Sequence, residues 1–480
     1  MSVTPLHPES KSKPSRRRFH QATPEEQAVK IAPPQLDLDN AVLQELLPDK
    51  TLEAMARKTN ALDQRQRKLT CAVFFWLIVL ALRPGVSLNL TTLVSMAVTA
   101  CLMAGMTAHQ AVLSKQAISE NFQRRPWQFF AEVLQYLLVA YATLFATPLG
   151  AADLALIQHL LLIDATVIRV ANTLIQTFPA HRTGRRAEWA ALKLHLAFRL
   201  FRAVPAVLAI TAQKVNERKV DFLRPRGELA LYVFDLGYWW YWLFDEIIER
   251  GQHFISRLRS DCNPLIKAVY QGSQEWVGKR LKDITLIGTE IDLLVNLSSA
   301  NPANPRMVHD VRLVGQWVSE NQAWHLYITS ILERSIYTIG LIVQIYALRW
   351  QIEILFRDLK SVLGIVNFIS TSENGVRIQI YAALIRYLLT RLIILKAAYQ
   401  TSTLVEEFSI PKCLIAVGQI MTQTVELIVK EQTPNWVTLE NRLVEVVIAV
   451  GRRPNRKRGH RLSRVKAQFQ AQPIPAAAPP

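Results

Sequence analysis

Cysteine is scarce in this sequence, and no metal-binding motif is built from it. The four cysteines lie far apart, no CxxC pair occurs, and no histidine stands beside any of them (Cys71, Cys101, Cys262 and Cys413). This usage argues against a disulfide scaffold or a zinc ribbon and is typical of a reducing cytosol. We expect no secretory signal peptide, because the first thirty residues are polar and include Arg16–Arg18 in place of an apolar core.

Acidic residues are the second shortage. The 480 residues contain 38 Asp+Glu against 56 Lys+Arg, which leaves a formal net charge of +18. Such an excess indicates a polyanionic partner, either nucleic acid or an anionic membrane surface, although it says nothing about the fold. Half of the residues are hydrophobic and 20% are charged, so wholesale disorder is excluded, and the length allows two or three domains.

Apolar runs long enough to span a membrane are also rare. Val133–Ala152 carries no charge, but polar residues, a proline and a glycine interrupt it, and its flanks are acidic rather than basic. Cys71–Leu82 is too short to cross roughly 30 Å of hydrocarbon. We therefore expect two buried helices and no membrane partner. A membrane protein is the alternative, and fractionation with detergent would test it.

The hydrophobic period changes along the chain and predicts its organisation. Apolar residues recur at helical spacing before about residue 155, whereas short runs rich in Val, Leu, Ile and Ala follow, as strands require. The helical N-terminal part fits a DNA-binding region and, equally, a plain helical bundle. The expected segments are a basic disordered tail (1–36), this N-terminal helical region (37–155), the first part of an α/β core (156–260), a strand-rich insertion (261–323), the second part of the core (324–400), a C-terminal helical region (401–450) and a basic low-complexity tail (451–480).

One long helix, expected from about residue 338 to 364, carries most of the chemical information. Tyr346, Glu353 and Lys360 are spaced by sevens, and Arg349 lies about 60° from them around the helix. The opposite face is an apolar stripe (Ile345, Leu348, Ile352, Leu355, Phe356 and Leu359). An acid flanked by cations and a phenol suits a metal-bound carboxylate beside phosphates. On spacing alone, a solvated stripe with Glu353 paired to a neighbouring cation is slightly favoured.

Two aspartates on predicted strands change that balance. Asp164 interrupts the apolar run "LLIDATVI", and Asp235 closes "LALYVFD". A carboxylate on an apolar strand is costly to desolvate unless it is paired or binds a cation. A turn-capping role is the alternative, and it suits Asp235 better than Asp164. Converging with Glu353, the two aspartates could hold two divalent cations roughly 3.5–4 Å apart, for which Mg²⁺ is the natural occupant.

The segment "IYALRWQIEILFRDLK" matches the signature Tyr-x2-Arg-x3-Glu-x6-Lys at Tyr346, Arg349, Glu353 and Lys360. With "IDAT" around Asp164 and the "DLGY" that begins at residue 235, the chain resembles bacterial insertion-sequence transposases of the DDE class. The resemblance implies an RNase H-like mixed sheet flanked by helices, with a strand-rich insertion and helical N- and C-terminal regions.

The resemblance also implies a function. The chain would be a cut-and-paste DNA transposase in which Asp164, Asp235 and Glu353 bind two Mg²⁺ (or Mn²⁺) and catalyse 3′ nicking, hairpin formation and opening, and strand transfer. The residues Tyr346, Arg349 and Lys360 of the signature, together with Arg257 in "FISRL", would contact DNA.

Further expectations follow from the same resemblance. The partners would be double-stranded DNA, as terminal inverted repeats and as target, and a second copy of the chain in a synaptic homodimer. The location would be the bacterial cytoplasm, in association with the nucleoid. The alternatives are a catalytically inactive, transposase-derived DNA-binding protein and an RNase H-like nuclease without strand transfer.

Overall fold

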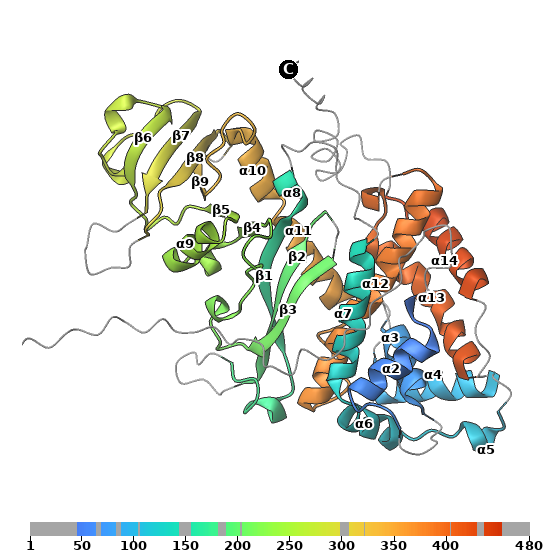
Figure 1. Ribbon diagram of the computed structural model, residues 1–480. Helices are drawn as coiled ribbons and strands as arrows, with labels where there is room; N and C mark the ends of the chain where they lie inside the picture. Colours follow the sequence, from blue (N-terminus) through green and yellow to red (C-terminus); the bar gives the residue numbers. More distant parts are fainter. Residues whose placement is uncertain are drawn as a thin grey trace, which may run out of the picture.

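One mixed sheet forms the centre of the protein (Figure 1). The computed structural model describes residues 46–63, 69–82, 88–103, 106–143, 155–180, 189–201, 204–297, 307–320, 322–403, 405–429 and 436–453. Within these ranges, nine strands are hydrogen-bonded in the order β3-β2-β1-β4-β5-β9-β8-β7-β6. The strands are β1 (Leu160–Arg169), β2 (Ala191–Arg199), β3 (Val204–Ala212), β4 (Leu231–Phe234), β5 (His253–Arg257), β6 (Leu265–Gln271), β7 (Glu290–Asn296), β8 (Val311–Val318) and β9 (Ala323–Thr329). The expected mixed α/β class is confirmed.

The three strands β1, β4 and β5 run parallel and set the register on which the site depends. Ile163 of β1 pairs with Phe234 of β4, and Phe234 pairs with Ser256 of β5. The next residue on each strand is therefore Asp164, Asp235 and Arg257, respectively. Neighbouring strands are roughly 4.8 Å apart, so these three residues follow one another at one level of the sheet. This level is the carboxyl end of β4 and β5 and the middle of β1.

The strand-rich insertion continues this sheet instead of forming a separate one. Strand β9 pairs antiparallel with β5 on one side and with β8 on the other. A buried ion pair anchors the insertion, because the Arg312 guanidinium donates to both carboxylate oxygens of Asp292 and to the carbonyl oxygen of Tyr337 at 2.6 Å. The insertion is thereby tied to the segment that leads into the next helix.

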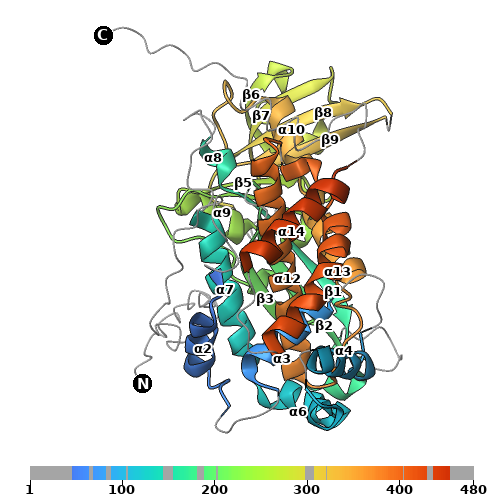
Figure 2. The same ribbon diagram turned by 90° about the vertical axis from the view of Figure 1, so that its right-hand side faces the viewer.

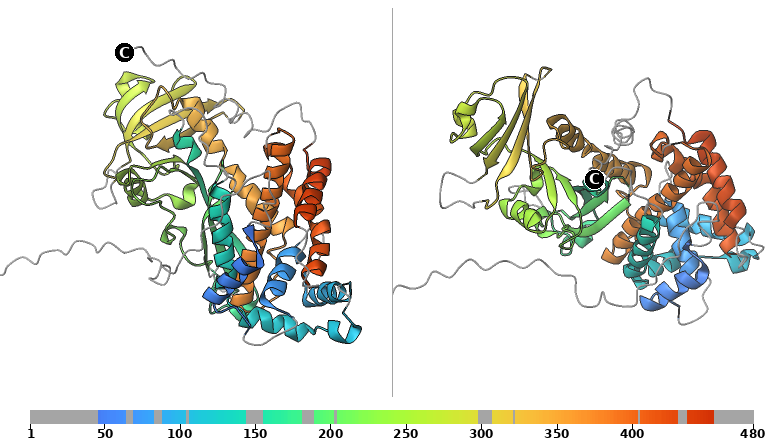
Figure 3. Two further views of the ribbon diagram at one scale, coloured as in Figure 1. Left: turned by 45° about the vertical axis from the view of Figure 1, so that its right-hand side comes forward. Right: turned by 45° about the horizontal axis from the view of Figure 1, so that its top comes forward.

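A layer of helices lies beside the part of the sheet formed by β1, β2 and β3, and strands β6 to β9 extend away from it, as Figures 2 and 3 show. It consists of α2 (Asp49–Lys58), α3 (Cys71–Ala81), α4 (Leu90–Met103), α5 (Ala108–Ala111), α6 (Lys115–Arg124), α7 (Trp127–Thr143), α12 (Glu373–Gln400), α13 (Ile410–Val429) and α14 (Trp436–Val450). Helix α12 is the centre of this layer and packs against α3, α7, α13 and α14. The Asn374 side chain fastens α12 to the junction of α6 and α7 by donating to the carbonyl oxygens of Phe122 and Arg125.

The two apolar stretches considered from sequence have different outcomes. Cys71–Ala81 is a buried helix, as expected. Val133 to Thr143 belongs to α7, and 144–152 lies outside the described residues. By length and composition, two other helices could cross a membrane: Ile339–Val362, with 39% of its apolar window buried, and Glu373–Gln400, with 89% buried. The expected tail at 1–36 lies outside the described residues, and so do residues 454–480 of the tail expected at 451–480.

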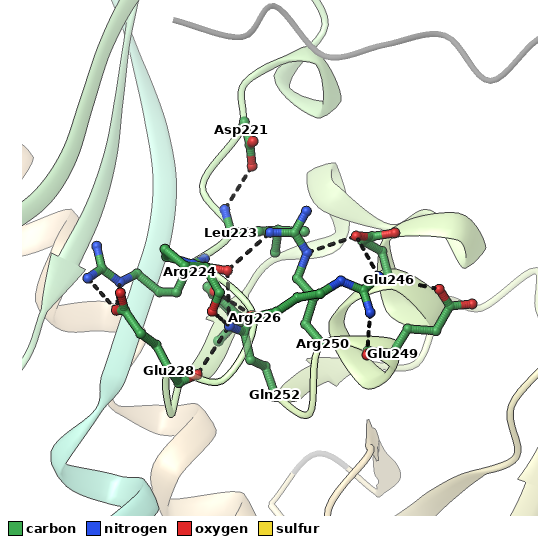
Figure 4. A network of polar contacts seen from close by, with 11 residues as sticks. Asp221, Leu223, Arg224, Arg226, Glu228, Glu246, Glu249, Arg250 and Gln252 are labelled. Carbon is green, nitrogen blue, oxygen red and sulfur yellow. Dashed lines mark hydrogen bonds and ion pairs between the residues drawn. The ribbon is translucent and has the colours of Figure 1, made fainter. Parts of the chain in front are cut away.

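The opposite face of the sheet is covered by α9 (Tyr241–Glu249) and by the connection from β3 to β4. Figure 4 shows the polar network that fixes this connection. The Gln252 amide donates to the carbonyl oxygens of Arg224, Pro225 and Glu228 and accepts from the Tyr232 hydroxyl. Because Gln252 is buried and fully bonded, the start of β4 is held in a single position beside the end of α9.

Candidate functional site

The helix that carries four of the candidate residues runs across the carboxyl ends of the parallel strands. It comprises α10 (Ile339–Ala347), α11 (Trp350–Arg357) and a π-helical turn (Asp358–Val362), and Thr338 caps its start by accepting from the Leu341 N–H. All six residues of the expected apolar stripe are buried. The predicted helix is therefore present, with its stripe toward the core.

Two irregularities distinguish this helix from the ideal one assumed from sequence. Between α10 and α11, the Arg349 N–H donates to the Tyr346 carbonyl, and the Ile352 N–H donates to the Arg349 carbonyl, so the helix tightens at this point. Lys360 lies in the π-helical turn, where the helix widens. Even spacing by sevens consequently does not fix where these side chains point.

The alternation of β1 decides which way Asp164 points. Leu160 and Leu162 belong to the core shared with the helices, whereas Leu161 and Ile163 belong to the core beneath α9. Asp164 continues the first set, so it faces the helical layer and α11. One oxygen, Oδ1, accepts the Ala165 N–H at 2.8 Å, which leaves Oδ2 directed at other partners.

Asp235 follows the last residue of β4 and begins a 3-10 turn, Leu236–Tyr238. Its Oδ1 accepts the Gly237 N–H at 2.8 Å. The turn-capping interpretation considered from sequence is thus correct for this carboxylate. It does not exclude a second role, since a carboxylate has about four lone-pair positions and the cap uses one of them.

Arg349 joins the strand and the helix. Its Nη2 is 2.6 Å from Glu353 Oε1, and its Nη1 is 4.0 Å from Asp164 Oδ2. Glu353 therefore does pair with a neighbouring cation, as the simpler alternative held. The same guanidinium, however, also reaches the carboxylate on β1, so the pair is not an isolated surface contact.

Two other carboxylates affect the ionisation of Asp164. Burial raises the pKa of Asp164 to about 7, the Ala165 N–H opposes this, and the nearby charges of Asp235 and Glu353 raise it further, against the Arg349 guanidinium. Like charges favour the protonated acid, and they act only at short range in a partly buried site. Asp164, Asp235 and Glu353 thus share one electrostatic environment.

A phenol pair and a second arginine lie beside Asp235. The Tyr346 and Tyr327 rings are 4.9 Å apart between centroids, and Tyr327 of β9 pairs with Arg257 in register. Burial raises the pKa of Tyr346, and Arg349, Asp235 and Arg257 all lie close enough to affect it. Sequence reasoning did not single out Tyr327, because its position in an alternating strand gave no chemical signal.

Lys360 lies apart from Asp164 and Arg349. Its Nζ donates to the Val167 carbonyl at 3.0 Å, three residues and so roughly 10 Å along β1 from Asp164. Burial lowers the pKa of this ammonium group. The structure therefore places Lys360 against the same strand as Asp164 but nearer its end.

Carboxylate oxygens are the ligands that Mg²⁺ prefers, so the types of side chain present suit a hard divalent cation. Within the described residues, however, no three His, Cys, Asp or Glu side chains are arranged closely enough to hold a metal ion. The pKa of Asp164 is raised first by burial and then by the charges of Asp235 and Glu353, and a bound cation would oppose both effects. The Arg349 guanidinium already supplies part of the positive charge that offsets these carboxylates.

Fold and site together define a mixed α/β protein in which carboxylates and cationic side chains meet at the carboxyl ends of parallel strands. Residues 157–389 match the family model described as "Transposase DDE domain", and this segment contains all three acids. Over these residues, just under half of the chain, the protein is similar to DDE-type transposases. The Tyr-Arg-Glu-Lys signature and the RNase H-like fold stay predictions.

Curated relatives are transposases of bacterial insertion sequences. A putative transposase of Sinorhizobium fredii is 28% identical over 222 residues, covering 44% of this chain and 57% of the relative. The transposase for insertion sequence element IS231B of Bacillus thuringiensis is 22% identical over 322 residues, covering 57% of this chain and 64% of the relative. The chain thus spans about three fifths of the length of these relatives.

A solved structure, the piggyBac transposase synaptic complex with hairpin DNA, covers 92% of this chain and 86% of its own with a TM-score of 0.41 and 10% identity. A similarity at this level carries no argument about fold or function.

Proposed function

We propose that this protein is a DNA transposase that moves an insertion sequence by cut-and-paste transposition at terminal inverted repeats. The observation that supports it most is the gathering of Asp164, Asp235 and Glu353, from β1, the end of β4 and α11, within one electrostatic environment. The transposase family match over the same segment supports it independently.

In this proposal the three carboxylates hold two Mg²⁺ ions, or Mn²⁺. When bound, such a pair activates the attacking oxygen and stabilises the leaving oxygen of an in-line displacement at phosphorus. The protein contributes the placement of its ligands. Asp164 is held by the Ala165 N–H and Asp235 by the Gly237 N–H, so two of the three acids are oriented by backbone donors.

We assign the surrounding cations and phenol to DNA. Arg257 is exposed on β5, one strand away from Asp235, and Tyr346 lies close to both of these residues. The Arg257 and Tyr346 side chains therefore suit contact with the phosphates of a bound DNA end. Arg349 would exchange its carboxylates for phosphate, and Lys360 would contact the backbone farther along. The proposed sequence of reactions is 3′ nicking, hairpin formation and opening, and strand transfer into target DNA.

The experiment uses the full chain, Mg²⁺ and a duplex that ends in the inverted repeat found beside the gene. Glu353→Gln should abolish nicking but keep end binding, because a metal ligand is lost while the phosphate contacts remain. Asp261→Asn, which removes an exposed carboxylate paired only with Arg259 among the contacts described, is the matched control and should cleave normally.

Each other outcome has a distinct meaning. Equal loss of binding and nicking in Glu353→Gln would remove Glu353 from the metal site. A wild-type chain that binds ends without cleaving them would instead be an inactive DNA-binding derivative. Cleavage without target-joined products would indicate a nuclease without strand transfer.

The remaining parts of the proposal concern assembly and location. We propose a homodimer that forms on paired inverted repeats, in the bacterial cytoplasm with the nucleoid and without a membrane partner. Light scattering with and without repeat DNA tests the dimer. Recovery of the chain only in detergent would contradict the proposed location, and the apolar helices Ile339–Val362 and Glu373–Gln400 make that measurement worthwhile.

A further inference from the structure

An ion pair with one buried partner lies on the opposite side of the sheet from α11, close to the turn that carries Asp235. Lys193 of β2 is buried, and its Nζ donates to Glu217 Oε1 at 3.1 Å and to the Val215 carbonyl at 3.2 Å. Lys193 pairs with Val167 of β1, on the face that continues Ile163 and therefore faces α9. The mechanism proposed above uses neither Lys193 nor Glu217.

The second oxygen of Glu217 packs against the turn itself. A Cβ added to Gly237 would lie 2.7 Å from Glu217 Oε2 and 3.0 Å from Asp235 Oδ1, so the two carboxylate oxygens flank the same point. A side chain at this position would therefore force the ends of the Glu217 and Asp235 side chains to shift. The peptide of this glycine also donates the 2.8 Å hydrogen bond to Asp235. Glu217 is therefore one contact away from the group that orients Asp235.

Tyr238, the next residue of the turn, supports the same arrangement. Its side chain is buried and lines, with Glu217, a small cavity of about 20 Å³ beneath α9. Burial raises the pKa of the Tyr238 phenol, and the charges of Glu217, Asp164 and Asp235 raise it further. The Glu217 carboxylate thus lies within electrostatic reach of the same turn as the two aspartates.

We propose that Glu217, held by Lys193, is a positioning residue that fixes the Gly237 turn and thereby the direction of the Asp235 carboxylate. Its Oε1 is bonded to the ammonium group and its Oε2 is pressed against the glycine, so it supports a ligand and is not one itself. This inference rests on the proposed function, in which Asp235 holds a divalent cation.

Metal binding gives a measurement that a purely structural role would not change. Mn²⁺ titrations of the DNA-free full chain, followed by electron paramagnetic resonance, should show binding weakened about 10- to 100-fold in Glu217→Gln and in Lys193→Met, the usual effect of losing a partner that orients a ligand. Lys396→Met is the matched control, because it breaks another buried Lys–Glu pair, with Glu440, among the helices. It should lower Tm but leave Mn²⁺ binding unchanged.

A second measurement tests the contact without any metal. Gly237→Ala should lower Tm, and it should do so clearly less in a Glu217→Ala background, because the nearer of the two clashing oxygens has gone. Equal losses of Tm in the two backgrounds would overturn the proposal. Mn²⁺ binding in Glu217→Gln within about twofold of wild type would also overturn it if Asp235→Asn does weaken binding. A loss of Mn²⁺ binding shared by Lys396→Met would overturn it as well.

The design separates this inference from the proposed function. Asp235→Asn is the reference and should weaken Mn²⁺ binding at least as much as Glu217→Gln. If Asp235→Asn binds Mn²⁺ normally while the two Gly237→Ala backgrounds differ, Glu217 still positions the turn, and the assignment of Asp235 as a ligand is what fails.

Discussion

Ionisation of Asp164 should destabilise the folded protein, the reverse of the usual effect of an acidic group. Its pKa is raised from 3.8 to about 7, first by burial and then by neighbouring carboxylates. Between these two values the folded protein keeps a proton that the unfolded chain has lost. Stability must therefore fall as pH rises from about 4 to about 7, and the loss persists above that. About three pKa units at 1.36 kcal/mol each make the full cost roughly 4 kcal/mol.

Asp164→Asn should remove this cost, because the amide resembles the protonated acid and cannot ionise. In urea denaturation with EDTA, the metal-free variant should gain on wild type by roughly 1.4 kcal/mol per pH unit from about pH 5 to about pH 7. The gap should then level off, leaving the variant more stable at about pH 8. Added Mg²⁺ should stabilise wild type more than the variant, because a ligand raises the stability of the state that binds it.

The matched control is Asp261→Asn. The hydrogen bond from Arg259 lowers the pKa of Asp261, so this group titrates below the window and its gap to wild type should not change with pH. A gap for Asp164→Asn that is also constant from about pH 5 to about pH 8 would refute the reasoning. A gap that moves in favour of wild type as pH rises would refute it as well.

Three further variants probe neighbouring contacts. Arg349→Ala should tighten Mn²⁺ binding to the DNA-free chain about tenfold near pH 8, because the substitution removes the guanidinium that now pairs with Glu353 and Asp164. Weaker Mn²⁺ binding would contradict this. Lys360→Ala should weaken end binding and reduce its salt dependence by about one unit of slope, whereas an unchanged slope would remove Lys360 from the DNA surface. Arg125→Met, which removes a buried guanidinium that bonds Asp63 and the Ala61 and Leu69 carbonyls, should lower the free energy of unfolding by roughly 3–5 kcal/mol in urea titrations without changing Mn²⁺ binding.

Local pattern was a good guide to the elements and a poor guide to the contacts between them. The apolar runs around Asp164 and before Asp235 gave strands β1 and β4, and the stripe from Ile345 to Leu359 gave a helix with its buried face correctly assigned. Burial period is a property of neighbouring residues and can be read from them. Tyr327 lies beside Tyr346 only because β9 pairs with β5, and nothing near either residue records that pairing.

Regular spacing along the long helix did not predict where its polar side chains lie. It assumed 100° per residue, whereas the backbone tightens at Arg349 and widens around Lys360. Such departures depend on what packs against the helix from elsewhere in the chain. For this reason the contact of Lys360 with the Val167 carbonyl could not be expected from sequence.

The sequence alone determined the alternation of burial, the excess of positive charge and the presence of two aspartates on apolar strands, where an acid is costly. Tertiary structure decided how these aspartates lie relative to the helix that carries Glu353. The parallel register of β1, β4 and β5 places Asp164, Asp235 and Arg257 at one level, and Arg349 brings Glu353 to them from the helix. The physical reason is that strand register is fixed by hydrogen bonds between segments tens of residues apart, whereas side-chain periodicity is fixed by the geometry of each segment itself.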